Sequence, residues 1–100
     1  MEIGKKKLFI FISNKKMYKI KKYSFDKAKL IGVQIRPSTV KNKKIDVFKN
    51  SKKIASIGDI RYSDFATTGD NERRRLYRIR HIKDRSIIGS NGWYASEILW

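Results

Sequence analysis

Positive charge restricts the folds open to this chain more than any other feature of its sequence. Twenty-five Lys and Arg residues stand against nine Asp and Glu residues, a formal net charge of +16 in 100 residues. Like charges held in so small a globule repel one another, and a domain of this size has only about 5–15 kcal/mol of stability to oppose them. The excess of cations therefore predicts an anionic partner. Drift in an A/T-rich genome also enriches Lys, but it leaves the arginine cluster of the second half unexplained.

Composition sets the remaining limits. Hydrophobic residues make up 40% of the chain and aromatic residues 12%, enough for one thin core and therefore one domain over residues 1–100. The absence of cysteine excludes disulfides, thiolate zinc sites and thiol nucleophiles. The longest apolar run covers residues 8–12, far short of the roughly 20 residues that cross a bilayer. We expect a soluble protein without a membrane span.

The two halves of the chain carry their charge differently. Residues 1–50 hold fifteen basic groups, fourteen of them Lys, against three acids, a net charge of +12. Residues 51–100 hold ten basic groups, seven of them Arg, against six acids, a net charge of +4. Because Arg grips phosphate or carboxylate in a bidentate fork while Lys is a hydrated point charge suited to non-specific attraction, we expect the two halves to contribute differently to binding.

Short segments rich in β-branched and aromatic residues predict the strands of a small sheet. Residues 8–12 and 17–23 are expected to pair as one hairpin, and residues 44–48 and 53–57 as another across a polar loop. A further strand over residues 31–35 ends at Arg36-Pro37, because proline lacks a donor. Residues 24–30 fit either a short helix or a loop.

A basic amphipathic helix is predicted over about residues 70–83. Asp70 is a good N-cap, and Glu72 in the first turn suits the helix dipole. Leu76, Ile79 and Ile82 share one side of the helix, which we expect to pack on the core. The opposite, basic side carries Arg74, Arg78, His81 and Arg85, with Arg73 and Arg80 flanking Tyr77.

After Gly89-Ser90-Asn91-Gly92 the chain closes with a short helix or strand containing Trp93 and Trp100. These two aromatics either seal the sheet or dock a neighbouring subunit. The sequence as a whole predicts an α+β fold: a small, mostly antiparallel sheet of four or five strands, one basic helix and this Trp-containing terminal element.

Few residues could carry catalysis. His81 is the one histidine, and the nearest thing to an acid pair is Asp59 with Asp64, which more often form salt bridges when they flank an arginine such as Arg61. We therefore expect no enzyme, no cofactor, no metal site and no small-molecule substrate.

The basic helix is the strongest functional signal. Its arginines could grip a sugar-phosphate backbone while Tyr77 stacks on a base or sugar, without reading sequence. An acidic protein surface is the alternative partner, and internal pairing with Asp64, Asp70, Glu72 and Asp84 is the structural alternative. The candidate binding residues are Arg73, Arg74, Tyr77, Arg78, Arg80, His81 and Arg85.

Residues 44–100 resemble a small uncharacterised basic domain that recurs in large double-stranded DNA viruses of eukaryotes. The resemblance rests on a combination of spaced short motifs and does not extend to residues 1–40. The motifs are Ile57-Gly58-Asp59, Tyr62-Ser63-Asp64-Phe65, Asp70-Asn71-Glu72-Arg73-Arg74, Tyr77, Arg80-His81, Gly92-Trp93-Tyr94 and Leu99-Trp100.

This resemblance implies a minor structural protein of a virion, assembled in the host cytoplasm or nucleus. Its partners would be capsid or core proteins and, as a further option, packaged nucleic acid. A free DNA- or RNA-binding protein of histone-like or ribosomal type is the alternative. The positions that the resemblance marks as a structural motif include Asp64, to which Arg80 or His81 could hydrogen-bond. They are Tyr62, Asp64, Phe65, Trp93 and Trp100.

Overall fold

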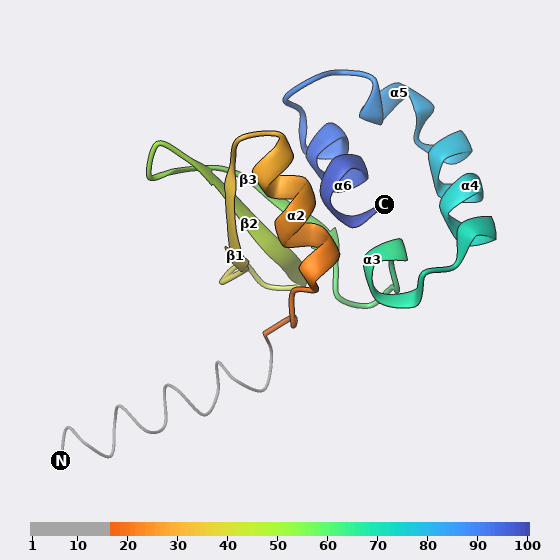
Figure 1. The fold of residues 1–100 in the computed structure, drawn as a ribbon, viewed down its shortest axis with the longest axis horizontal. Helices are drawn as coiled ribbons and strands as arrows, with labels where there is room; N and C mark the ends of the chain where they lie inside the picture. The colour runs from red at the N-terminus through yellow and green to blue at the C-terminus, as the bar shows by residue number, and fades with distance from the viewer. Residues whose placement is uncertain (1–16) are drawn as a thin grey trace, which may run out of the picture.

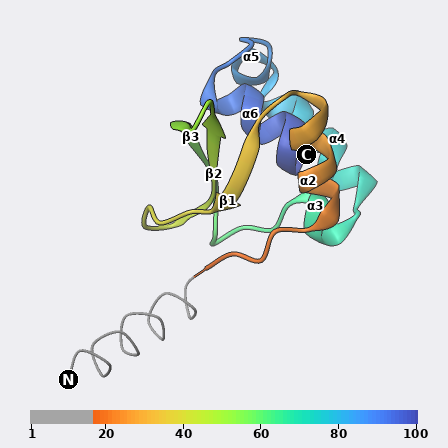
Figure 2. The same ribbon diagram turned by 60° about the vertical axis from the view of Figure 1, so that its left-hand side comes forward.

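The computed structural model describes residues 17–100, in which a three-stranded antiparallel sheet is covered on one face by two helices (Figure 1). The turned view shows the helices gathered on one side of the sheet (Figure 2). In chain order the elements are α2 (Lys22–Leu30), β1 (Gln34–Pro37), β2 (Lys43–Lys49), β3 (Lys52–Asp59), α3 (Phe65–Thr68), α4 (Asn71–Arg80), α5 (Ile82–Arg85) and α6 (Asn91–Leu99).

Helix α2 replaces part of a predicted strand. Residues 17–21 have no regular structure, and the chain turns helical at Lys22, so the prediction of a strand over 17–23 is wrong. An ion pair of 2.7 Å between Lys22 and Asp26 supports the first turns. At the other end Gly32 adopts φ 75°, which lets Val33 N–H bond back to the Ala28 carbonyl in a Schellman motif. The prediction for residues 8–12 lies outside the described residues.

The second predicted hairpin is confirmed. Strands β2 and β3 pair antiparallel, with Ile45 opposite Ile57 and Val47 opposite Ala55. Their connection is tighter than expected, because only Asn50 and Ser51 separate the strands. Both residues have positive φ, 53° and 64°, as a type I′ turn requires. Strand β1 then adds to the other edge of β2, with Ile35 opposite Val47.

The core lies between the sheet and helices α2 and α6. Its most deeply buried side chains are Ile45, Val47, Ile57, Ile98 and Leu99, all at most 2% exposed. The hydroxyl of Ser24 donates to the carbonyl of Ile98 at 2.8 Å and ties α2 to α6 inside this layer. The sheet and the two helices therefore enclose the hydrophobic core of the described residues.

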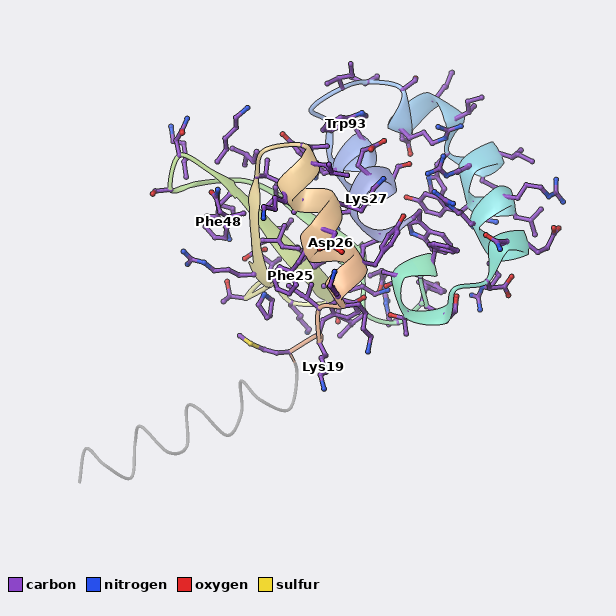
Figure 3. All side chains as sticks on the ribbon, in the orientation of Figure 1. Lys19, Phe25, Asp26, Lys27, Phe48 and Trp93 are labelled. Atoms are coloured by element: carbon purple, nitrogen blue, oxygen red, sulfur yellow. The ribbon has the colours of Figure 1, made fainter. Side chains whose placement is uncertain are left out.

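The opposite face of the sheet carries no helix within residues 17–100 (Figure 2). There the guanidinium of Arg36 lies 4.6 Å from the ring centroid of Phe48. Figure 3 shows Phe48 on the side of the sheet remote from α4. Burial raises the pKa of Asp46, but the hydroxyls of Ser38 and Ser56 donate to its carboxylate and leave the pKa below its usual value. Asp46 thus pins the chain after β1 to the sheet.

The α+β class agrees with the prediction, but the strand count does not. The described residues hold three strands rather than four or five. Residues 17–23 form no strand, and the terminal element is the helix α6, which begins at Ser90, whose hydroxyl accepts from Trp93 N–H. The expected single helix over 70–83 starts at the Asp70 cap as predicted, then breaks at His81 into α4 and α5.

Candidate functional site

The side of α4 that faces the rest of the protein is not the side that its sequence predicts. Leu76, Ile79 and Ile82 are 42%, 58% and 61% exposed, so the apolar side points to solvent instead of packing. Segment 60–88 arches around the end of α6, and α4 lies in this arch (Figure 1). The prediction of a packed apolar side is therefore wrong, because the neighbour that α4 meets is the aromatic end of α6 rather than an aliphatic layer.

The inward side of α4 is held by an aromatic stack. The ring of Tyr77 lies between His81, at 4.2 Å between centroids, and Trp100, at 4.1 Å and only 3° from parallel. Burial raises the pKa of the Tyr77 hydroxyl. Since both faces of the Tyr77 ring are covered, Tyr77 has no free face on which a base could stack, contrary to the role its sequence position predicts.

Three of the predicted binding arginines also point inward. Arg74 Nε donates to the backbone carbonyl of Trp100 at 2.6 Å, and its guanidinium lies 4.7 Å from the ring centroid of Phe65. Arg78 reaches the same carbonyl at 3.4 Å, while Arg85 Nε donates to the carbonyl of Arg78. Burial, followed by the charges of Arg74 and Arg85, lowers the pKa of Arg78. These contacts dock α4 against the end of α6.

Arg73 and Arg80 differ from these three, because both are exposed and neither forms an ion pair within residues 17–100. The acids that could have neutralised them are used elsewhere. Asp70 caps α4, Glu72 pairs with Arg75, Asp84 lies 3.2 Å from His81, and Asp64 pairs with Lys44. Internal pairing by these four acids thus neutralises Arg75 but not Arg73 or Arg80.

A pocket of about 500 Å³ opens between α4 and the end of the sheet. We call it the α4 pocket; apolar side chains of Leu76, Ala95, Leu99 and Trp100 line it together with Arg73 and Arg80. Asp59 also lines it, but the Arg61 guanidinium donates to both of its carboxylate oxygens and holds its pKa down at about 2. The pocket therefore combines an apolar lining with two uncompensated cations.

Asp64 anchors the pocket wall. This carboxylate is 2% exposed and accepts from Lys44 Nζ at 2.5 Å, from the Tyr18 hydroxyl at 3.0 Å and from Thr67 N–H at 2.8 Å. Burial and the Asp64 charge raise the pKa of Tyr18 to about 12 against the effect of the Thr67 hydroxyl. The predicted bond from Arg80 or His81 to Asp64 is not formed, because His81 instead turns to Tyr77 and Asp84.

Of the other motif positions, some side chains pack against the core and one is exposed to solvent. Phe65 packs edge-on against Tyr23, and Trp93 packs edge-on against Tyr94 and the core. Lys27 of α2 reaches across to Glu97 of α6, at 3.9 Å (Figure 3). Tyr62, by contrast, is 68% exposed and lines the α4 pocket. Trp93 and Trp100 both contact the core, as the sealing alternative predicts.

Sequence reasoning missed Lys44, Tyr18 and Gly58 as parts of this site. The Lys44–Asp64 pair spans 20 residues and the Tyr18–Asp64 bond 46, so no local spacing signals either. Gly58 directly follows the predicted strand over residues 53–57 and in the structure lies within β3, where a glycine often marks a close approach of two chain segments.

Within residues 17–100, no three His, Cys, Asp or Glu side chains are grouped to hold a metal ion. In the same part of the chain, no helix is long and apolar enough to span a membrane.

Part of the chain matches a known protein family. Residues 33–81 match a family of unknown function, DUF5754, which covers the sheet, α3 and α4 but leaves α6 outside. No curated protein and no solved structure is detectably similar to the chain. The matched family adds no activity to what the geometry of the α4 pocket indicates.

Proposed function

We propose that the protein is a non-catalytic binding protein that holds the anionic backbone of a nucleic acid along the pocket side of α4, without sequence preference. One observation carries this proposal: Arg73 and Arg80 are exposed at one pocket and lack a carboxylate partner within residues 17–100, in a chain of net charge +16. Uncompensated arginines favour phosphate, which they can grip through two hydrogen bonds.

The spacing of the two arginines suits a backbone. Arg80 follows Arg73 by seven positions in α4, which is two turns and roughly 10 Å along the axis. They therefore lie on the same side of α4, as their shared place in the pocket lining reflects. One strand of a nucleic acid advances about 3.4 Å per nucleotide, so the two side chains could contact phosphates about three nucleotides apart.

An acidic protein surface is the second candidate partner. The exposed strip of Leu76, Ile79 and Ile82 beside these arginines favours it, since protein interfaces combine an apolar centre with a charged rim. A role as a minor structural protein of a virion, in contact with capsid or core proteins, rests on the motif resemblance of residues 44–100. Cross-linking mass spectrometry of intact particles tests this role: cross-links to capsid or core proteins support it, and absence of the chain from the particle contradicts it.

Charge reversal of the two pocket arginines tests the main proposal. We expect Arg73→Glu with Arg80→Glu to weaken binding of a fluorescently labelled 20-nucleotide single strand at least about tenfold, because charge-assisted hydrogen bonds are worth about 1.5–3 kcal/mol each. Arg75→Glu with Lys83→Glu is the matched control, since it makes the same change in net charge at exposed positions outside the pocket lining. Fluorescence anisotropy at low salt gives the affinities.

Equal losses in the two double variants would contradict a contact localised at the pocket. If the unaltered protein binds no strand at low salt but does bind polyglutamate, the acidic protein surface replaces nucleic acid as the partner. Circular dichroism of each variant establishes that the fold is intact.

A further inference from the structure

The α4 pocket offers more than two cations. Its lining includes the apolar side chains of Leu76, Ala95 and Leu99, and Tyr62 lies in the same lining with 68% of its surface exposed. Tyr77 cannot stack on a ligand, because His81 and Trp100 cover its two faces. Among the aromatic side chains of the lining, Tyr62 is the most exposed and so the most accessible to a planar partner.

The loop that carries Tyr62 is fixed although its ring is not. The backbone carbonyl of Tyr62 accepts from Lys44 Nζ at 2.6 Å, and the same Nζ pairs with the buried Asp64. Tyr62 N–H in turn donates to the carbonyl of Asp59 at 3.1 Å. An exposed ring on a fixed backbone loses little conformational freedom on binding, which favours a stacking role over a purely architectural one.

The pocket lining also carries an excess of positive charge. Lys44 is neutralised by Asp64, and Asp59 by Arg61. Among the described residues this leaves Arg73 and Arg80 as the lining cations without an acid. A ligand that fits both features carries a planar apolar body and a negative group attached to it.

We propose that the α4 pocket takes one unpaired nucleobase, with Tyr62 against its ring and the attached phosphate held by Arg73 or Arg80. This inference rests on the proposed function and adds what the site selects, namely single-stranded over duplex nucleic acid. A volume of about 500 Å³ lies in the usual range for small-molecule sites, so a base and its sugar fit. A paired base would first have to leave its duplex, which costs free energy that an unpaired base does not lose.

A base with an attached phosphate also occurs as a free mononucleotide, and the experiment separates the two sources. Binding is measured for a ten-nucleotide thymidine strand, an abasic strand of equal length and charge, the matching duplex, and thymidine monophosphate. We expect the thymidine strand to bind about 5- to 150-fold more tightly than the abasic strand, because stacking contributes that much per base. Stronger binding of the monophosphate than of the strand would assign the pocket to free nucleotides.

Variants place the effect in the pocket. Leu76→Trp should fill the pocket and remove the preference for bases, whereas Ile79→Trp, on the same exposed apolar side but outside the pocket lining, should leave it unchanged. Tyr62→Ala should reduce the preference and Tyr62→Phe restore it, since only the ring is needed. In Trp93→Phe, the remaining Trp100 reports directly, because it lines the pocket and its fluorescence should be quenched by thymidine but not by the abasic strand.

The two proposals fail in different ways. If the abasic strand binds as well as the thymidine strand, the pocket holds no base, although backbone binding stands. If neither strand binds at low salt, backbone binding is wrong and this inference is wrong with it. Equal effects of Leu76→Trp and Ile79→Trp would also overturn the assignment to the pocket.

Discussion

At the scale of single residues, Asp64 and Gly58 do most to shape the site. Asp64 is buried with Lys44, and a buried ion pair stabilises a fold only when its remaining hydrogen-bonding groups are satisfied. Here Tyr18, Thr67 and the Tyr62 carbonyl complete them. The pair therefore fixes the loop behind β3 without leaving a buried charge unpartnered.

Gly58 is required for two separate reasons. Its φ of 80° lies in the left-handed region, and a Cβ there would come within 2.8 Å of Leu99 Cδ1 and 3.0 Å of Lys44 Cδ. We expect Gly58→Ala to lower the free energy of unfolding by about 2–4 kcal/mol, through backbone strain and overpacking together.

Gly89→Ala is the control for that substitution. Gly89 has a comparable φ of 89°, but nothing lies within 4 Å of an added Cβ, so strain alone applies and the loss should be about 1 kcal/mol. Urea unfolding of both variants measures the difference. Equal losses would show that Gly58 is not tightly enclosed by Leu99 and Lys44.

At the scale of elements, helix α4 carries the largest departure from the sequence pattern. Helical periodicity correctly predicts which residues lie on the same side of α4, and the Asp70 cap correctly predicts where the helix begins. Periodicity does not give which side meets the core when both sides contain large groups. Arginines can pack their stems and bond a carbonyl, as Arg74 and Arg78 do, and aromatic stacking at Tyr77 then decides the orientation.

This orientation predicts an unusual order of stabilities. Ile79→Glu should change the free energy of unfolding by less than about 0.5 kcal/mol, because Ile79 is 58% exposed. Arg74→Ala should lower it by about 1–3 kcal/mol, because it removes a bond to the Trp100 carbonyl and the contact with Phe65. Urea unfolding checks both, and the reverse order would mean that the apolar side packs inward.

Other elements show where sequence suffices. Alternation and a polar gap predict the β2–β3 hairpin, since both signals are local. Residues 17–23 alternate as well, yet have no strand partner in the described chain and pass into α2, where the Gly32 stop signal and the Lys22–Asp26 pair act. The Lys44–Asp64 contact and the α4 pocket depend on packing of distant segments, which no local pattern contains.

At the scale of the whole molecule, the acidic side chains of the described fold are engaged in structural contacts. They cap helices or pair locally, as Asp70 and Asp59 do, or are buried, as Asp46 and Asp64 are. Arg73 and Arg80 remain uncompensated at the pocket, and the chain as a whole keeps its net charge of +16. An external anion would relieve this excess, and we propose that a nucleic-acid backbone supplies it.

The salt dependence of binding tests that claim most directly. For a single-stranded 20-mer, log Kobs should fall linearly with log salt concentration at a slope of about −0.7 per phosphate contact, so about five contacts give a slope near −3.5. Reversal of Arg73 and Arg80 together should flatten the slope by about 1.4, the share of two contacts. A slope near zero, or one that the double reversal leaves unchanged, would contradict backbone binding at the α4 pocket.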